Sequence, residues 1–250
     1  MQNLPSELLA TYFKTAKASF EFGGVQNLGV DFDYITEVSS VYSAQIEGNS
    51  LDVNSYFNQK EFQGKTKTKD FLEIQDLSKA YQFAFENEFT FQNILKVHSL
   101  LSKSILDVNS RGKVRPVPIG VFGSRGLIYM AVEPEFVDRE LRALMSDLVE
   151  LIKQDLSETE AVFLASVVHL RIAQIHPFID GNGRLARLCE KWFLKNCLPE
   201  KSKLIWSTQS ERYYFENKKE YYSCINIGQD YYNLDFSLTL NFSRFVERAF

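Results

Sequence analysis

The segment HPFIDGNGRLAR, residues 176–187, joins two stretches of helical hydrophobic pattern and concentrates the polar chemistry of the chain. Gly181 and Gly183 let the backbone turn, and they let a ligand approach peptide N–H groups just before a helix, where those groups have no intrahelical partner. A helix start of this kind binds anions. Arg184 and Arg187 are three residues apart, so two guanidinium groups can hold successive phosphates. The segment therefore predicts a polyphosphate site at the start of a helix.

His176 and Asp180, in the same loop, suit a reaction on that phosphate. A carboxylate repels phosphate unless a cation lies between them, and proteins usually hold Mg²⁺ in this way, so Asp180 implies magnesium. His176, with an ordinary pKa near ~6.5, can accept a proton from an attacking hydroxyl. His98 and His169 lie on helical stretches without a glycine loop beside them, so we interpret them as core residues. The loop predicts phosphoryl or nucleotidyl transfer with His176 as the base.

The helices on either side of the loop have clear start and stop signals. Ser157 and Glu160 form a capping box, and the apolar residues that follow, as far as Ile175, predict a central buried helix. The helix after the loop ends before Pro199. Apolar residues three or four apart predict further amphipathic helices over 71–85, 90–105 and 134–151. No Gly-, Pro- or Ser-rich linker separates these segments, so we expect one mainly helical domain.

Between two of these helices the pattern changes to short β-prone runs. Residues 117–122 and 127–132 flank a turn bounded by Gly123 and Gly126. Two such runs around a glycine-bounded turn predict a β-hairpin with an exposed tip.

Composition limits the class of protein. The 250 residues are 45% hydrophobic and 24% charged with a formal charge of −4, which is typical of a globular chain without the basic excess that nucleic-acid binding needs. No apolar run approaches the ~18 residues of a membrane span, and residues 1–20 hold no uninterrupted apolar signal core. Three cysteines without a CxxC pair suit a reducing compartment. We therefore expect a cytoplasmic protein that binds neither nucleic acid nor a membrane.

The twelve-residue loop matches the signature HxFx(D/E)GNGRxxR of the Fic family at every specified position, and the chain resembles that family from about residue 41 to residue 225. The resemblance implies a mainly α, Fic-like helical bundle with a β-hairpin flap beside the active-site loop. It also implies transfer of AMP from ATP to a Ser, Thr or Tyr hydroxyl of a target protein. We expect an N-terminal helical region over 1–90, a catalytic core over 91–228, and a C-terminal extension over 229–250 packed on the core.

The resemblance also gives roles to individual residues. His176 would deprotonate the target hydroxyl, and Asp180 would hold Mg²⁺ between the α- and β-phosphates of ATP. Five residues would bind the phosphates: Gly181, Asn182 and Gly183 as a nest of N–H groups, Arg184 at the β-phosphate and Arg187 at the γ-phosphate. Tyr221 and Tyr222 would lie near the adenine and ribose, with aromatic core packing as the alternative. The flap residues Val117, Pro118, Ile119 and Gly120 would align the target segment by strand-like pairing.

A second motif, SAQIEGN at residues 43–49, resembles the inhibitory signature (S/T)xxxE(G/N) of some Fic proteins. Ser43 and Glu47 are four residues apart and share one face of a helix that Gly48 would end. The Glu47 carboxylate suits Arg187, and an ion pair between them would occupy the group meant for the γ-phosphate. The motif predicts autoinhibition by charge competition, with ATP bound in an unreactive pose.

Several alternatives stay open on sequence grounds. Glu47 could instead orient a water that removes AMP from a modified protein, and related proteins transfer UMP, phosphocholine or phosphate on the same scaffold. A non-catalytic nucleotide-sensing module is a third reading, although the intact His176 argues against it. Gly64-Lys65-Thr66 resembles the end of a P-loop, but Gln59 replaces its first glycine, so we interpret the segment as a loop. A homodimer stays open because Fic-like proteins form dimers.

Overall fold

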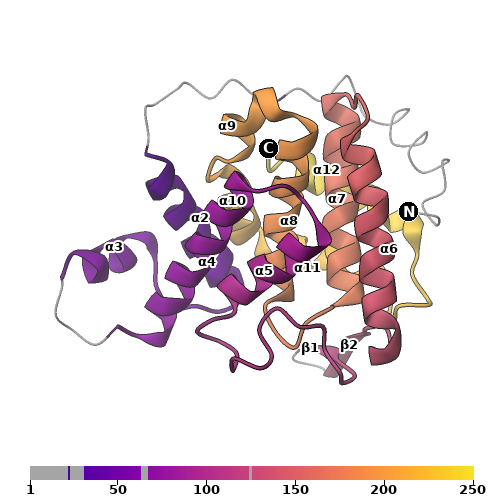
Figure 1. Ribbon diagram of the computed structural model, residues 1–250, viewed down its shortest axis with the longest axis horizontal. Coiled ribbons are helices and arrows are strands. Elements are labelled where there is room, and N and C mark those ends of the chain that lie inside the picture. Colours follow the sequence, from indigo (N-terminus) through magenta and orange to yellow (C-terminus); the bar gives the residue numbers. More distant parts are fainter. Residues whose placement is uncertain (1–21, 23–30, 63–66, 124–125) are drawn as a thin grey trace.

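The computed structural model describes residues 22, 31–62, 67–123 and 126–250 (Figure 1). Three interpretations concern residues outside this description: those of residues 1–20, of the Gly64-Lys65-Thr66 segment, and of the hairpin tip at Ser124 and Arg125.

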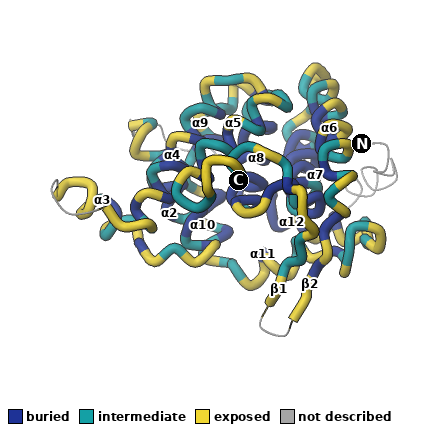
Figure 2. The backbone as a smooth tube through the Cα atoms, turned by 60° about the horizontal axis from the view of Figure 1, so that its bottom comes forward, coloured by how far each residue is buried: buried dark blue, intermediate teal, exposed yellow. Residues whose placement is uncertain are grey.

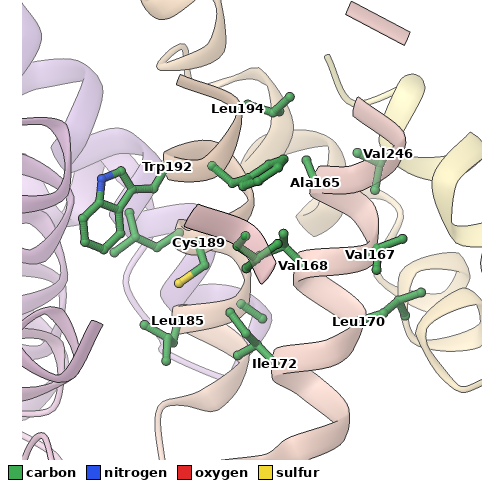
Figure 3. Close-up of a cluster of buried hydrophobic side chains, with 14 of the residues drawn as sticks. Ala165, Val167, Val168, Leu170, Ile172, Leu185, Cys189, Trp192, Leu194 and Val246 are labelled. Atoms are coloured by element: carbon green, nitrogen blue, oxygen red, sulfur yellow. The ribbon is translucent and has the colours of Figure 1, made fainter. Parts of the chain in front are cut away.

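Two adjoining helices, α7 (Glu158–Ile175) and α8 (Asn182–Cys197), form the centre of the molecule. The capping box of Ser157 and Glu160 is present, and most of both helices is buried, so the predicted central buried helix is confirmed. Figure 3 shows Val168 and Ile172 of α7 among the apolar side chains packed against those of α8. Because both helices are held along their length, the short loop between them is fixed at one end of the core.

The chain before this pair contributes helices on both sides of it (Figure 1). These are α2 (Phe32–Ile46), α3 (Val53–Glu61), α4 (Lys69–Glu86), α5 (Phe91–Leu101) and α6 (Pro134–Ile152). The helices predicted over 71–85 and 134–151 are confirmed as α4 and α6. The helix predicted over 90–105 begins after its Thr90 cap but ends at Leu101, so its last residues were predicted wrongly. The chain leaves α5 in turns that bring the Gly112 N–H to 3.0 Å from Nδ1 of His98.

The chain after α8 folds back over the core. Its elements are η1 (Pro199–Lys201), α9 (Ser202–Ile205), α10 (Gln209–Glu216), α11 (Lys218–Ile225), η2 (Phe236–Leu238) and α12 (Thr239–Glu247). α12 packs on α7 through Phe242, whose ring lies against His169, and through Ser243, which bonds Ser166, and α10 packs against α2. No helix in the described part of the chain is long and apolar enough to cross a membrane.

The predicted β-hairpin is confirmed as β1 (Gly120–Gly123) paired antiparallel with β2 (Gly126–Met130). It projects from the helical body with much of its backbone exposed (Figure 2). The first strand was predicted to begin at Val117, but it begins at Gly120; the second was predicted over 127–132, but it spans Gly126–Met130. Pro116 and Pro118 have no N–H to donate to a strand ladder, which accounts for the late start. Val117, Pro118 and Ile119 therefore lead into the hairpin rather than forming its strand.

Candidate active site

His176 ends α7 in a left-handed conformation, with φ 50° and ψ 59°. Among the described residues it is the single non-glycine residue with positive φ. This conformation costs an L-residue about 1–2 kcal/mol, so the contacts around it must hold it in place. Its N–H donates to the Ile172 carbonyl at 2.9 Å, and its own carbonyl accepts from Nε of Arg115 at 2.7 Å. Backbone geometry and a buried arginine together fix the predicted base.

The imidazole of His176 is arranged to accept a proton. Its Nδ1 lies 3.3 Å from the carbonyl oxygen of Ala173, which can only accept, so Nδ1 carries the hydrogen and Nε2 keeps its lone pair. Burial is the largest cause of the lowered pKa of His176, and the positive charge of Arg115 acts in the same sense. The Ala173 hydrogen bond and the carboxylates of Glu47 and Asp180 act in the opposite sense. The net effect favours the neutral imidazole that a general base needs.

The loop between the two helices is closed by its own polar groups. The side chain of Asn182 accepts from the Phe178 N–H at 2.9 Å and donates to the Phe178 carbonyl at 2.8 Å. Gly181 is the N-cap residue of α8 with φ 83°, and a Cβ there would come within 2.8 Å of Leu101. Glycine is therefore required at this position by both conformation and space.

His98 of α5 contacts the same loop at Phe178 and Asp180. Its ring stacks on Phe178 with centroids 3.6 Å apart, and its Nε2 lies 2.8 Å from the Asp180 carbonyl. Burial is the main cause that lowers the pKa of His98 to about 4, so the ring is neutral, donates from Nε2 and accepts the Gly112 N–H at Nδ1. The interpretation as a core residue is confirmed, since His98 is fully buried. Its support of the loop could not be predicted from its helical position.

Arg187, on the second turn of α8, is 1% exposed and holds four hydrogen bonds. Nε and Nη2 donate to the Ser43 hydroxyl and carbonyl, each at 2.9 Å, and Nη2 also donates to Oε1 of Glu47 at 2.7 Å. Nη1 donates to the Tyr221 hydroxyl at 3.2 Å. The structure thus brings Ser43, Glu47 and Arg187 together from segments about 140 residues apart.

Glu47 also lies against the backbone of the α8 start. A Cβ at Gly183 would collide with the Glu47 carboxylate, which is therefore seated at the helix start where the sequence predicts an anion nest. Burial alone would raise the pKa of Glu47, but the guanidinium groups of Arg187 and Arg184 outweigh it and hold that pKa below its ordinary value. A carboxylate of this chain stands where a phosphate is expected to bind.

Arg184 faces a carboxylate that sequence reasoning missed. Its Nη1 lies 3.0 Å from Oε1 of Glu73 on α4, and its Nη2 lies 3.8 Å from Asp180. The Arg184 side chain is 8% exposed, and its Nε and Nη1 have no hydrogen bond of good geometry. Asn49 donates to the other oxygen of Glu73 at 3.2 Å. A signal was present, because Glu73 is a carboxylate four residues before Leu77 on the apolar face of α4.

Tyr221 is buried, and its hydroxyl contacts Arg187 and His169. The hydroxyl lies 3.2 Å from Nη1 of Arg187 and 2.9 Å from Nε2 of His169, whose Nδ1 lies 2.7 Å from Glu190. The Tyr221 ring stacks on Tyr214 and packs near Phe242 and Phe245, which is the core packing that the sequence left open. His169 is fully buried, as interpreted from the sequence. Tyr222 is half-exposed and donates to the Ile46 carbonyl at the end of α2.

Asp180 is the residue of the loop that could contact a cation. Its carboxylate is 53% exposed, and Oδ1 accepts the Gly181 N–H at 2.5 Å. The described residues contain no group of three or more His, Cys, Asp or Glu side chains that could hold a metal ion. A lone exposed carboxylate beside an anion site fits a Mg²⁺ whose other ligands are phosphate oxygens and water, rather than a site built from protein ligands.

The comparisons with known proteins agree with this geometry. A family model described as Fic/DOC family matches residues 88–194. The chain is 26% identical over 163 residues to Protein adenylyltransferase fic-1 of Caenorhabditis elegans, a match that covers 59% of this chain and 29% of that protein. Its fold is similar to that of a Fic family protein from Desulfovibrio desulfuricans G20, with a TM-score of 0.71 and 21% identity over 97% of this chain and 69% of the other.

A further solved structure, IbpAFic2 in complex with adenylylated Cdc42, has a TM-score of 0.51 and 14% identity, covering 97% of this chain and 69% of that one. The fold and the loop define a mainly helical protein in which the signature loop leads into the start of α8 beside a β-hairpin. The chain contains a Fic/DOC family domain over residues 88–194, and its fold is that of the Fic protein structures it resembles. It spans less than a third of the length of the curated C. elegans relative.

Proposed function

We propose that the protein is a protein adenylyltransferase that moves AMP from ATP to a hydroxyl side chain of a target protein. The observation that carries the proposal is one site that combines a neutral imidazole acceptor, His176, with the open N–H groups of the α8 start and two buried guanidinium groups, Arg184 and Arg187. The name of the C. elegans relative supports the same reaction.

The residues of the chain divide the work of this reaction. Nε2 of His176 accepts the proton of the target hydroxyl, whose oxygen attacks the α-phosphorus of ATP, and the bond to pyrophosphate breaks. The N–H groups at Gly181 to Gly183, with Arg184 and Arg187, hold the phosphates and offset the charge that develops on them. Asp180 would hold Mg²⁺, which neutralises phosphate charge when bound.

The hairpin is the proposed docking surface for the target protein. In the described part of the chain, β1 pairs with β2 alone, so its other edge can accept an extended segment by main-chain pairing. Val117 to Gly120 lead into that strand and would contact the same segment. The neighbour IbpAFic2, solved with adenylylated Cdc42, supports a protein as the acceptor.

The Glu47–Arg187 pair supports autoinhibition of this activity. The pair occupies the guanidinium proposed to hold the γ-phosphate, and the Glu47 carboxylate lies on the anion-binding helix start. Glu47 would therefore leave ATP bound in an unreactive pose until α2 moves or the side chain swings away.

Label transfer from α-labelled ATP with Mg²⁺ tests the proposal and supplies the first prediction. We expect Glu47→Gly to label itself or lysate proteins roughly 10²-fold more than wild type, because one preorganised donor at developing charge changes rates by about that factor. We expect Glu47→Gly to leave ATP affinity similar, and the added change His176→Ala to abolish the label.

Glu37→Gly is the matched control, since Glu37 lies on the same helix and pairs with Lys60 away from the site. Equal labelling by wild type and Glu47→Gly would contradict the proposal that Glu47 inhibits the activity. No label from any form despite ATP binding would overturn AMP transfer. The same assay with UTP and with a pre-modified substrate would then test another donor and AMP removal.

A further inference from the structure

Arg115 is a buried cation outside the signature loop. It is 1% exposed, and each hydrogen bond of its guanidinium within the described chain ends on a backbone carbonyl. Nε donates to His176 at 2.7 Å and Nη1 to Val117 at 2.8 Å, while Nη2 donates to Val132 at 2.5 Å and to Ile175 at 3.3 Å. A guanidinium used in this way serves as a structural cross-link.

The acceptors belong to two different parts of the molecule. Val117 and Val132 flank the hairpin at its base, one before β1 and the other after β2. Ile175 and His176 are the end of α7, whose terminal carbonyls lack intrahelical donors and carry partial negative charge. The Arg115 guanidinium therefore donates hydrogen bonds both to the last carbonyls of α7 and to the carbonyls on either side of the hairpin.

Two further bonds run between the same parts. The Arg115 backbone N–H donates to the Pro177 carbonyl at 2.9 Å, directly after the base. The Tyr129 hydroxyl of β2 donates to the Gln174 carbonyl in the last turn of α7, also at 2.9 Å. Four consecutive carbonyls, from Gln174 to Pro177, are thus bonded to Arg115 or to the hairpin.

We propose that Arg115 is a positioning residue, which locks the hairpin and the left-handed His176 backbone into one rigid unit. The inference rests on the proposed function. A target strand docked on the hairpin is then presented to Nε2 of His176 at a constant distance. Arg115 itself touches neither substrate nor the reacting atoms, so it acts through His176 and through the hairpin backbone.

The geometry explains why arginine is required. Its rigid planar fork donates in several fixed directions at once, whereas the ammonium of a lysine is a single point on a flexible stem. The phosphate-binding arginines are held independently, by Ser43 and Glu47 at Arg187 and by Glu73 at Arg184. Loss of Arg115 should therefore disturb presentation of the hydroxyl while leaving nucleotide binding in place.

Amide hydrogen exchange on the full chain tests the cross-link without any need for AMP transfer. In Arg115→Lys and Arg115→Met we expect the Ala131 and His176 amides, one beside the hairpin and one at the base, to exchange at least about tenfold faster together. The Leu185 amide on α8 should not change. Arg171→Met is the matched control, because Arg171 lies near the end of α7 but bonds side-chain oxygens of Gln174 and Tyr231.

Kinetics in the Glu47→Gly background supply the functional readout. We expect kcat to fall by about 10²-fold in Arg115→Lys, as for a misplacement of about 1 Å, with KM for ATP changed less than about twofold. Faster exchange at only one of the two amides, or at neither, would overturn the inference. So would a loss of ATP binding as large as the fall in kcat. If Arg115→Met does not fold, Arg115→Lys decides on the same amides. If Glu47→Gly itself transfers no AMP, the proposed function is wrong. The hydrogen-exchange result still tests the Arg115 cross-link, because it does not depend on AMP transfer.

Discussion

At the scale of single residues, the hydrogen-bond partners of each charged side chain define the site. Arg187 is held from one side by Ser43 and Glu47 and from the other by Tyr221. When Glu47 is removed, the Tyr221 hydroxyl and its chain of partners, His169 and Glu190, still hold the guanidinium. Tyr221, which is predicted to lie near the adenine and ribose, is thus also placed to orient Arg187.

Replacement of Tyr221 by Phe should weaken ATP binding through Arg187. The lost hydroxyl is a buried acceptor for a charged donor, and a bond of this kind contributes about 1.5 kcal/mol, which is roughly tenfold in KM for ATP. The measurement is KM for ATP in the Glu47→Gly background. Tyr214→Phe is the control, because its hydroxyl bonds Glu190 without contacting Arg187. An equal rise in KM in both variants would show that the effect is loss of stability alone.

The pH dependence of transfer should report the environment of His176. Burial first, and then Arg115, lower its pKa, and the neutral ring is the active form of a base. Activity of Glu47→Gly should therefore fall on the acid side with a midpoint below the ordinary value of ~6.5. In Arg115→Met the midpoint should move upward, because a positive charge that disfavours protonation is gone. A pH–kcat/KM profile of both forms checks the direction, and a midpoint above 6.5 in the parent would contradict it.

At the scale of elements, the helix–loop–helix unit of α7 and α8 is determined by local rules. A capping box starts α7, the left-handed His176 ends it, and Gly181 with positive φ starts α8. Asn182 then closes the turn through both backbone groups of Phe178. The loop conformation is thus held by contacts within the chain itself, which is the condition for preorganised charge stabilisation.

Replacement of Gly181 by Ala should destabilise this unit. The φ of 83° costs an alanine about 1 kcal/mol, and the new Cβ would press on Leu101. We expect a melting temperature several degrees lower, since about 1 kcal/mol corresponds to roughly 2–4 °C for a chain of this length. Gly48→Ala is the comparison, because Gly48 also has positive φ, at 99°, but open space around its Cβ position. A smaller loss at Gly181 than at Gly48 would contradict the steric part of the explanation.

At the scale of the whole molecule, the N-terminal helices bring carboxylates to both arginines proposed to bind phosphate. α2 contributes Glu47 to Arg187, and α4 contributes Glu73 to Arg184. Asn49, two residues after Glu47, bonds Glu73, so the two contacts meet in one short segment. On the proposed function, the phosphates of ATP would compete with Glu47 for Arg187 and with Glu73 for Arg184.

Replacement of Glu73 by Gln should therefore tighten ATP binding. The change removes a negative charge beside the expected β-phosphate and releases Arg184 from its ion pair, and like charges in contact are costly. We expect Kd for ATP to fall by about tenfold by calorimetry in the Glu47→Gly background. Glu86→Gln, an exposed carboxylate at the far end of the same helix, is the matched control. Weaker binding in Glu73→Gln would mean that Glu73 aligns Arg184 for phosphate instead of competing with it.

The sequence by itself determined the features that depend on neighbours along the chain. Helix caps, apolar periodicity, the turn of the glycine loop and the spacing of Arg184 and Arg187 are all set within a few residues, so they can be predicted from pattern. β1 begins three residues later than its β-prone pattern predicts, because Pro116 and Pro118 have no N–H to donate to a strand ladder.

Tertiary structure decided which distant residues share the site. Glu73, Arg115 and the His169–Glu190 pair that contacts Tyr221 come from different elements, and in sequence each of these four residues occupies an ordinary helix or loop position. Some of the partners at this site are far apart along the chain: Arg115 bonds Val132, 17 residues away, and Arg187 bonds Ser43, 144 residues away. Packing of the helices alone fixes such pairings, because a buried charge takes whichever partner the fold places beside it.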